Sequence, residues 1–255
     1  MVTLLLKKSY RHRDLKEITF KDLWSSYGIF TTMRVIGKPA KILFFKVHIN
    51  NLIKSLKVYK VYKKDLKKGI LKLIKLNLKK NKKYDHLLRV AANNKMISIS
   101  LRKRLMPKSN FVLKLINYKR IEPEYKNLKY KKILSILNKM DNTKFDIALY
   151  KNKKILESGT SNLLFLQNNK IYSPINDFYK GTTLKFFLKK INIYKKNIFI
   201  NSLNLYDEII IIGSGKGVSS VNTIKNIRWK RKSLKFYKKL SNIYKKEIII
   251  SPIYR

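Results

Sequence analysis

Glu157-Ser-Gly-Thr-Ser-Asn162 is the stretch that decides how the second half of the chain is interpreted. It is a loop of small polar residues between two apolar segments, and the composition of those segments favours β-strands. Such a loop brings one carboxylate, several hydroxyls and several backbone N–H groups into a small volume. An ordinary hydrophilic turn would have the same composition, so this stretch alone does not assign chemistry.

The apolar pattern on both sides of this loop predicts strands mixed with helices. In the second half we expect a helix over 127–140, strands over 145–150 and 208–212, a hairpin of 162–167 with 170–173, and helices starting near residue 183 and over 233–244. In the first half we expect a hairpin of 31–35 with 41–47, helices over 49–56 and 64–78, and strands over 86–92, 96–101 and 111–118. This mixture predicts an α/β (α+β) fold.

The segment 119–125 interrupts the pattern. Pro123 disfavours helix at Glu122, and the charges around it favour exposure. We therefore expect an N-terminal α/β domain over 1–118, an interdomain loop over 119–125 and a C-terminal domain over 126–255. A chain of 255 residues with 45% hydrophobic content is large enough to bury two such cores.

Composition excludes several classes of site. The chain has no cysteine, which excludes disulfides, thiolate metal sites and a cysteine nucleophile. Its three histidines are far apart in the sequence, so we expect no metal site. The first apolar run is too short for a signal peptide, and no stretch approaches the roughly 18 apolar residues of a membrane span. We expect a cytoplasmic protein without a membrane partner.

The net charge of +46 has two interpretations, a surface for nucleic acid or a coat of solvated lysines. Only ten of the 60 basic residues are arginine, the residue that phosphate recognition favours, and the lysines run through the whole chain. We prefer the lysine coat and do not expect nucleic acid as the partner.

Three further features carry chemical meaning. Lys180-Gly-Thr-Thr183 precedes a helical pattern, which suits a phosphate seat as well as an ordinary threonine cap. Gly213-Ser-Gly-Lys-Gly217 follows an apolar strand and suits anion binding, but its spacing does not match a nucleotide-binding P-loop. Lys126 begins the second half, and one lysine among fifty means little by itself.

Together with Glu157, these features form a set that pyridoxal 5′-phosphate (PLP) requires. That cofactor needs a lysine amine for covalent attachment, a cradle for its phosphate and an acidic partner for its pyridine nitrogen. We therefore expect PLP as the cofactor.

At this point the sequence resembles the class IV PLP-dependent family of fold type IV, which includes aminodeoxychorismate lyase and the branched-chain and D-amino acid aminotransferases. Lys126-Asn-Leu-Lys-Tyr130 resembles the family's lysine motif, and Asp146-Ile-Ala-Leu149 begins 20 positions later, as in the family. Spacing from Lys129 would be 17, so Lys126 fits better. Glu157 to Phe165 resembles the family's Glu-Gly-Ser-Ser-Asn-Val-Phe element.

Further motifs follow in the family's order over nearly the whole chain. Tyr27 to Arg34 resembles its Gly-Val-Phe-Glu-Thr-Leu-Arg segment, and His48-Ile-Asn-Asn-Leu52 stands where His-x-x-Arg-Leu is usual. Tyr172-Ser-Pro174, Gly181 to Leu184 and Asp207 to Ser214 resemble later elements. The resemblance implies a small N-terminal domain and a larger β-rich C-terminal domain with the cofactor between them.

The resemblance also implies roles for individual residues. Lys126 would bind the cofactor covalently and move the proton at the substrate's reacting carbon, and Glu157 would pair with the pyridine nitrogen. The residues implied to hold the phosphate are Thr182, Thr183 and Ser214. Phe30, Arg34 and Arg89 are the candidates on the substrate side.

One departure affects the cofactor. Asn51 replaces the family's phosphate-binding arginine, and the lost charge-assisted bond would weaken cofactor binding by about 1.5–3 kcal/mol. Lys54 is close enough in sequence to be a candidate for compensation. The family's arginine after Gly-Ile-Thr is also missing, which leaves the substrate class open.

The chemistry therefore has alternatives. The first expectation is a 4-amino-4-deoxychorismate lyase that releases pyruvate and 4-aminobenzoate from a small anionic amine, because the short chain resembles the lyase in size. The alternative is a transaminase of the branched-chain or D-amino acid type. A third hypothesis, from another class, is a basic nucleic-acid-binding protein without catalysis. Family resemblance also implies a homodimer.

Overall fold

The computed structural model describes residues 4–79 and 82–254, which form two compact units. Unit 1 comprises the chain up to Arg104, the segment Tyr125–Lys131 and the last residues from Ile250. Unit 2 comprises Leu105–Glu124 and Lys132–Ile249. Each unit has its own sheets and core, and the domain limits expected from the sequence, 1–118 and 126–255, remain a prediction.

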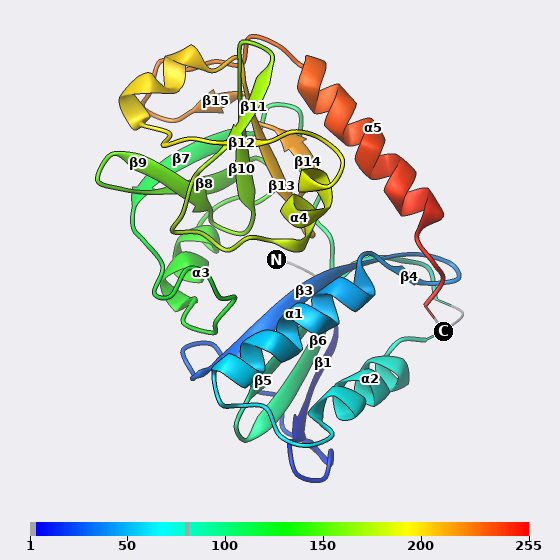
Figure 1. Ribbon diagram of the computed structural model, residues 1–255. Helices are drawn as coiled ribbons and strands as arrows, with labels where there is room; N and C mark the ends of the chain where they lie inside the picture. The colour runs from blue at the N-terminus through cyan, green and yellow to red at the C-terminus, as the bar shows by residue number, and fades with distance from the viewer. Residues whose placement is uncertain (1–3, 80–81, 255) are drawn as a thin grey trace. The chain divides into compact units, whose positions relative to one another are not determined.

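Unit 1 is built on one antiparallel sheet of order β2-β1-β6-β5-β3-β4. The strands are β1 (Leu4–Arg11), β2 (Glu17–Ile18), β3 (Gly28–Gly37), β4 (Lys41–Ile42), β5 (Tyr84–Asn93) and β6 (Met96–Lys103). Helices α1 (Phe45–Val58) and α2 (Leu66–Asn77) lie on the same face of this sheet (Figure 1).

The helical spacing explains how unit 1 closes its core. Ile49, Leu52 and Leu56 form one buried stripe of α1, and Ile70 with Ile74 forms that of α2. These stripes pack on alternate side chains of the strands, among them Met33, Leu88, Val90 and Ile99. The opposite face of the sheet carries the residues in between, which are largely polar or aromatic.

Unit 2 contains two sheets around a second core. The first has the order β15-β7-β8-β9. Its strands are β15 (Thr223–Ile224), β7 (Val112–Asn117), β8 (Phe145–Lys151) and β9 (Lys154–Ser158). The second has the order β12-β11-β10-β13-β14. Its strands are β12 (Tyr194–Lys195), β11 (Lys170–Ser173), β10 (Asn162–Gln167), β13 (Glu208–Gly213) and β14 (Gly217–Ser220). Phe111, Phe165, Tyr206 and Ile211 are among the side chains buried in the core of this unit.

The helices of unit 2 are α3 (Lys131–Leu137), α4 (Thr182–Leu188), the 3₁₀ helix η1 (Ile200–Leu205) and α5 (Lys235–Ile250), labelled except for η1 in Figure 1. The buried carboxylate of Glu208 accepts hydrogen bonds from the backbone N–H groups of Phe236 and Tyr237 and so stabilises the start of α5. No helix in the described parts of the chain is long and apolar enough to cross a bilayer.

The predicted α/β class is confirmed, and so is the hairpin of β10 with β11. Two local predictions are wrong. The strand expected over 41–47 ends at Ile42, because Phe44 takes a left-handed backbone conformation (φ 54°) and α1 begins at Phe45. The helix expected over 127–140 covers only Lys131–Leu137, because the residues before it pair with β3.

That pairing depends on Gly28. A Cβ at this position would lie 2.3 Å from the carbonyl oxygen of Ala92 and 2.8 Å from Cδ1 of Leu128. We predict that Gly28→Ala lowers the free energy of unfolding by about 1–3 kcal/mol, as overpacking generally does. Urea denaturation of the purified variant measures this change.

Gly69→Ala is the matched control. The atoms nearest to its Cβ would be those of the flexible Leu15 side chain, at 3.2 Å, and alanine is the better helix former within α2. We expect this variant to be as stable as the wild type or more stable. Equal stability of Gly28→Ala and the wild type would contradict the close approach seen here.

Candidate active site

Lys126 is fixed to unit 1 by backbone hydrogen bonds to β3. The N–H of Phe30 donates to the carbonyl of Lys126 (2.9 Å), and the N–H of Leu128 donates to the carbonyl of Gly28 (2.9 Å). β4 pairs with β3 only at Val35 and Ile36, so the edge at 28–30 is open to this segment. The residues around Lys126 thus act as a short added strand, which explains why they are not helical.

An aromatic group lies beside the Lys126 amine. Its Nζ is 4.9 Å from the ring centroid of Phe30. Phe30 makes edge contacts with Trp24 (4.9 Å) and Tyr130 (5.6 Å). An amine over an aromatic face is stabilised by the ring quadrupole, and the rings exclude water from that side.

His48 lies behind this group and stays neutral. It is buried, and its Nδ1 is 2.8 Å from Oγ1 of Thr31. Burial, helped by the charge of Lys126, lowers the pKa of His48 to about 3. His48 therefore adds no positive charge beside the Lys126 amine near neutral pH.

Arg89 extends the aromatic group on the same face of the sheet. Its guanidinium Cζ is 4.4 Å from the Trp24 ring, and it forms an ion pair with Asp22. Only 9% of Arg89 is exposed, and this burial lowers the pKa of its guanidinium. Lys126, Phe30, Trp24 and Arg89 thus form one continuous chain of contacts within unit 1.

A strap over 20–26 holds Trp24 and Asp22 in place. The hydroxyls of Ser9 and Ser98 both bond to the backbone carbonyl of Lys21, at 3.3 and 2.6 Å, and the Lys21 N–H donates back to the Ser9 hydroxyl. These two serines lie opposite each other on β1 and β6. The strap therefore crosses the face of the sheet that the helices leave uncovered.

The other predicted residues of unit 1 are engaged differently, although Arg34 is diagonal to Arg89 across β3 and β5. Arg34 is buried and engaged with Asp85, through Nε at 3.3 Å and Nη2 at 3.2 Å. It lies four residues beyond Phe30 on β3, which corresponds to about 13 Å along a strand. Asn51 is half-buried on α1, one turn after His48.

Glu157 is buried in unit 2 and is held by Arg120. Nε of Arg120 donates to Oε1 of Glu157 at 2.6 Å, and Nη2 donates to Oε2 at 3.3 Å. The N–H of Tyr179 donates to Oε2 as well, at 3.3 Å. A carboxylate with a bidentate arginine and an amide donor is stabilised as the anion, which is the form that can hold a proton on a partner nitrogen.

Sequence reasoning missed Arg120, since the segment 119–125 was expected to be exposed. That expectation is wrong for this residue, which is only 4% exposed and also donates to the carbonyl of Pro123 at 2.7 Å. A signal for the burial of Arg120 was present in the composition, because arginine is scarce in this chain and most of its basic residues are lysine.

Three loops of unit 2 meet around Asn162 and Ser161. The amide of Asn162 donates to the carbonyl of Tyr179 (2.7 Å) and accepts from the N–H of Gly181 (3.1 Å). A Cβ on Gly213 would lie 2.5 Å from Oγ of Ser161. The loop after β9, the start of α4 and the β13–β14 turn with Ser214 are therefore neighbours.

Two hydroxyls in these loops fit an absent ligand. Oγ1 of Thr183 and Oγ of Ser161 are both buried and have no hydrogen-bond partner in the structure. Burying a hydroxyl without a partner costs about 1–3 kcal/mol, so such atoms usually await a ligand or a water. Thr182 and Thr183 are the first residues of α4, where N–H groups also lack helical partners. These donors fit phosphate oxygens; Ser161 was not predicted.

Asp146 forms hydrogen bonds with the loop that follows Glu157. It is fully buried and accepts from the Ile147 N–H (2.8 Å) and from the hydroxyls of Ser158 and Thr160 (both 3.4 Å). Burial raises the pKa of Asp146, against the opposing charge of Lys216. Its role is to fix the loop.

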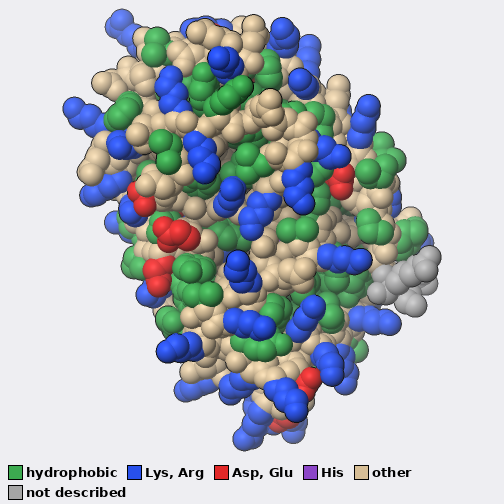
Figure 2. Space-filling model, in the orientation of Figure 1, with side chains coloured by type: hydrophobic (Ala, Val, Ile, Leu, Met, Phe, Trp, Pro, Cys, Tyr) green, Lys and Arg blue, Asp and Glu red, His purple; other side chains and the backbone are tan. Residues whose placement is uncertain are grey.

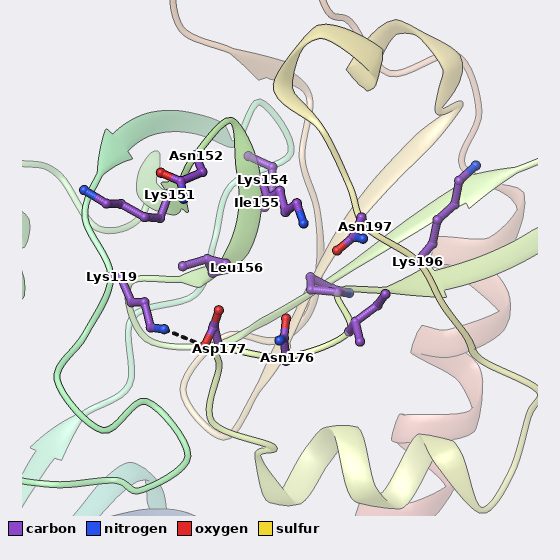
Figure 3. Close-up of a pocket in the computed structure, with 12 residues that line it drawn as sticks. Lys119, Lys151, Asn152, Lys154, Ile155, Leu156, Asn176, Asp177, Lys196 and Asn197 are labelled. Carbon is purple, nitrogen blue, oxygen red and sulfur yellow. Dashed lines mark ion pairs between the residues drawn. The ribbon is translucent and has the colours of Figure 1, made fainter.

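A separate hollow of about 190 Å³ opens elsewhere in unit 2 (Figure 3). The close-up shows the ion pair of Lys119 with Asp177 (2.6 Å) at this hollow, with Leu156 and the amide of Asn197 beside it. None of the predicted cofactor or substrate residues lines it. It is therefore not the predicted cofactor cradle.

Basic side chains are spread over the visible face of the molecule. Figure 2 shows Lys and Arg scattered over the visible face, with only a few acidic side chains among them. This distribution matches a lysine coat.

Comparisons with known proteins agree with this fold. The chain matches no curated protein by sequence. A branched-chain aminotransferase from Thermoproteus uzoniensis, with norvaline, superposes at a TM-score of 0.74 with 14% identity, covering 94% of this chain and 93% of that one. The PLP form of the Thermobaculum terrenum branched-chain aminotransferase gives 0.73 and 14%, covering 94% and 92%.

A candidate 4-amino-4-deoxychorismate lyase from Legionella pneumophila gives a TM-score of 0.70 with 17% identity, covering 87% of this chain and 91% of that one. At such low identity these likenesses establish the fold alone. The predicted fold type IV is thereby confirmed.

The family follows from the sequence model. The model described as amino-transferase class IV matches residues 28–224, which include every predicted site residue and most of both units. The expected family and its PLP dependence are confirmed with it. The chain belongs to the class IV aminotransferase family of PLP-dependent enzymes.

Proposed function

We propose that the chain is a 4-amino-4-deoxychorismate lyase that releases pyruvate and forms 4-aminobenzoate. The observation that carries this proposal is the wall beside Lys126, where Phe30, Trp24 and Tyr130 adjoin the guanidinium of Arg89. Flat rings next to a buried cation suit a cyclic, unsaturated carboxylate better than a small branched aliphatic side chain.

The residues present fit the cofactor. The donors of Thr182, Thr183, Ser161 and Ser214 suit its phosphate, since the hydroxyls of Thr183 and Ser161 are buried and have no hydrogen-bond partner among the described residues. Glu157 would face its pyridine nitrogen as a carboxylate held by Arg120. Asn51 would stand on the phosphate side without the family's arginine. The bound cofactor supplies an electron sink for the substrate carbon that carries the amine.

Lys126 would perform two tasks. Its amine would hold the cofactor, and after release it would take the proton from the ring carbon that carries the amine. A neutral amine is needed for the second task. Loss of that proton permits the neighbouring ring carbon–oxygen bond to break, so that the ring becomes aromatic and enolpyruvate leaves, which takes up a proton to become pyruvate.

The cytoplasmic location and the homodimer belong to the same proposal, supported by family resemblance. A small anionic amine remains the proposed substrate, with Phe30, Arg34 and Arg89 as the candidates on its side; each of the two arginines forms an ion pair with an aspartate.

The covalent role of Lys126 has a direct optical test. We expect purified wild-type protein reconstituted with PLP to show the visible absorption band of a lysine-bound cofactor, and Lys126→Ala to lose it. Lys129→Ala is the matched control, three residues further along, and it should keep the band. A band that survives in Lys126→Ala, or that only Lys129→Ala removes, would show that the lysine is misassigned.

The Arg120–Glu157 pair can be tested by a double-mutant cycle. Arg120→Gln leaves a buried carboxylate without its cation, so we predict a loss of about 3–5 kcal/mol in the free energy of unfolding. Adding Glu157→Gln removes that charge and should recover part of the loss. Urea denaturation of the wild type, both single variants and the double variant measures the coupling.

Additive losses in that cycle would mean that the two side chains do not depend on each other. As a functional readout, Glu157→Gln should also lower kcat by about 10²–10⁴-fold, the range typical of a lost proton-holding group.

The reaction itself is tested with aminodeoxychorismate and the reconstituted wild-type enzyme. We expect pyruvate and 4-aminobenzoate in equal amounts, followed by coupled reduction of pyruvate and by fluorescence. Branched-chain or D-amino acids with 2-oxoglutarate serve as the comparison. Formation of keto acids from them, without pyruvate release from aminodeoxychorismate, would favour the transaminase.

A further inference from the structure

A second arginine lies next to Arg89 on the uncovered face of the unit 1 sheet. In the β5–β6 ladder, Arg89 is opposite Ser100 and Leu87 is opposite Arg102. Arg89 and Arg102 are therefore diagonal neighbours on one face, with Cβ atoms roughly 7 Å apart and side chains long enough to meet. Ser98, which holds the strap, lies on the same face.

Arg102 has no acceptor in the described structure. None of its guanidinium nitrogens takes part in a hydrogen bond or an ion pair with residues 4–79 or 82–254, although the side chain is half-buried. The nearby carboxylates are already engaged, Asp22 with Arg89 and Asp85 with Arg34 and Arg104. Nε of Arg89, itself nine-tenths buried, also lacks a partner.

Two neighbouring guanidiniums without enough carboxylates are unfavourable in the free protein. Burial lowers the pKa of both arginines, and the charge of Arg89 lowers that of Arg102 further. A fold that retains such a pair gains most from an anion that binds both. The pair also belongs to the chain of contacts that begins at Lys126, through Arg89, Trp24 and Phe30.

We propose that Arg102 is a specificity residue that holds a second carboxylate of a dianionic cyclic substrate, while Arg89 holds the first. This inference rests on the proposed function, because it places the substrate beside Lys126. The Asp22 side chain is 55% exposed, so the pair of Arg89 and Asp22 is open on one side, and Arg89 retains N–H donors for a ligand. The site would therefore discriminate between cyclic acids with two carboxylates and those with one.

Equilibrium binding separates this role from catalysis. Isothermal titration of PLP-reconstituted, full-length protein would use isophthalate as the dicarboxylate probe and benzoate as the monocarboxylate probe, at constant ionic strength. We expect the wild type to bind isophthalate at least about tenfold more tightly than benzoate. Arg102→Gln should abolish this preference and leave benzoate affinity unchanged, whereas Arg89→Gln should weaken both.

Lys103→Gln is the matched control, because it removes one positive charge from the adjacent, exposed position of β6. It should retain the preference for isophthalate. Equal loss in Lys103→Gln, or unchanged isophthalate binding in Arg102→Gln, would overturn the proposal.

Thermal unfolding without ligand gives a readout that a merely structural arginine would not produce. Removing an unpartnered cation should leave the melting temperature of Arg102→Gln equal to or above that of the wild type, while the isophthalate-induced rise is lost. A lower melting temperature together with an intact ligand-induced rise would assign Arg102 to folding instead.

Failure of the proposed function is distinguishable from failure of this inference. If aminodeoxychorismate releases no pyruvate but Arg102→Gln still removes the preference for isophthalate, the dicarboxylate subsite stands and the lyase assignment falls. If pyruvate is released and the Arg102→Gln variant has an unchanged KM, the subsite falls and the lyase assignment stands.

Discussion

The candidate site depends on backbone pairing between residues 126–128 and the open edge of β3. Two hydrogen bonds, from Phe30 to Lys126 and from Leu128 to Gly28, fix the direction in which the lysine side chain leaves the backbone. An amine on a free loop would lose side-chain entropy each time it reached a ligand, whereas this one is already ordered over Phe30. The absence of a side chain at Gly28 is what allows the segment to approach.

In unit 2, a carboxylate and the loops around it are likewise held in place before a ligand binds. Glu157 is held from two directions by Arg120 and Tyr179, and Asp146 fixes the loop that follows it. The hydroxyls of Thr183 and Ser161 are buried without partners in loops that Asn162 ties together. This preparation for a ligand costs stability in the free protein, which ligand binding would restore by mass action.

Residue patterns predicted the fold class, the family and most elements with strong periodicity. The alternation over 96–101 and the apolar spacing of α1 are local signals, and the structure confirms both elements. Failure occurred where long-range pairing overrides local preference. Residues 127–130 have ordinary helical composition, but the open edge of β3 takes their hydrogen bonds.

The site was predictable in part for a related reason. Glu157 and Lys126 stood in motifs, so their places in the sequence could be found. Arg120, which holds Glu157, acts through a contact between segments far apart in the chain, and no spacing rule reveals such a contact. Asp146 also stood in a motif, but its hydrogen bonds to Ser158 and Thr160 did not follow from the spacing. Arg102 was missed because its significance lies in partners that are absent, which only coordinates can show.

The unequal burial of the two basic residue types has a consequence for interpreting such chains. The sequence has ten arginines and fifty lysines, and within the part of the chain that the structure describes four arginines but only one lysine, Lys216, are buried. Lysine is a strongly hydrated point charge, while the planar guanidinium keeps several hydrogen bonds when water is removed. In proteins whose composition drifts toward lysine, the arginines that remain therefore mark positions where the fold needs a positive charge that is buried away from water.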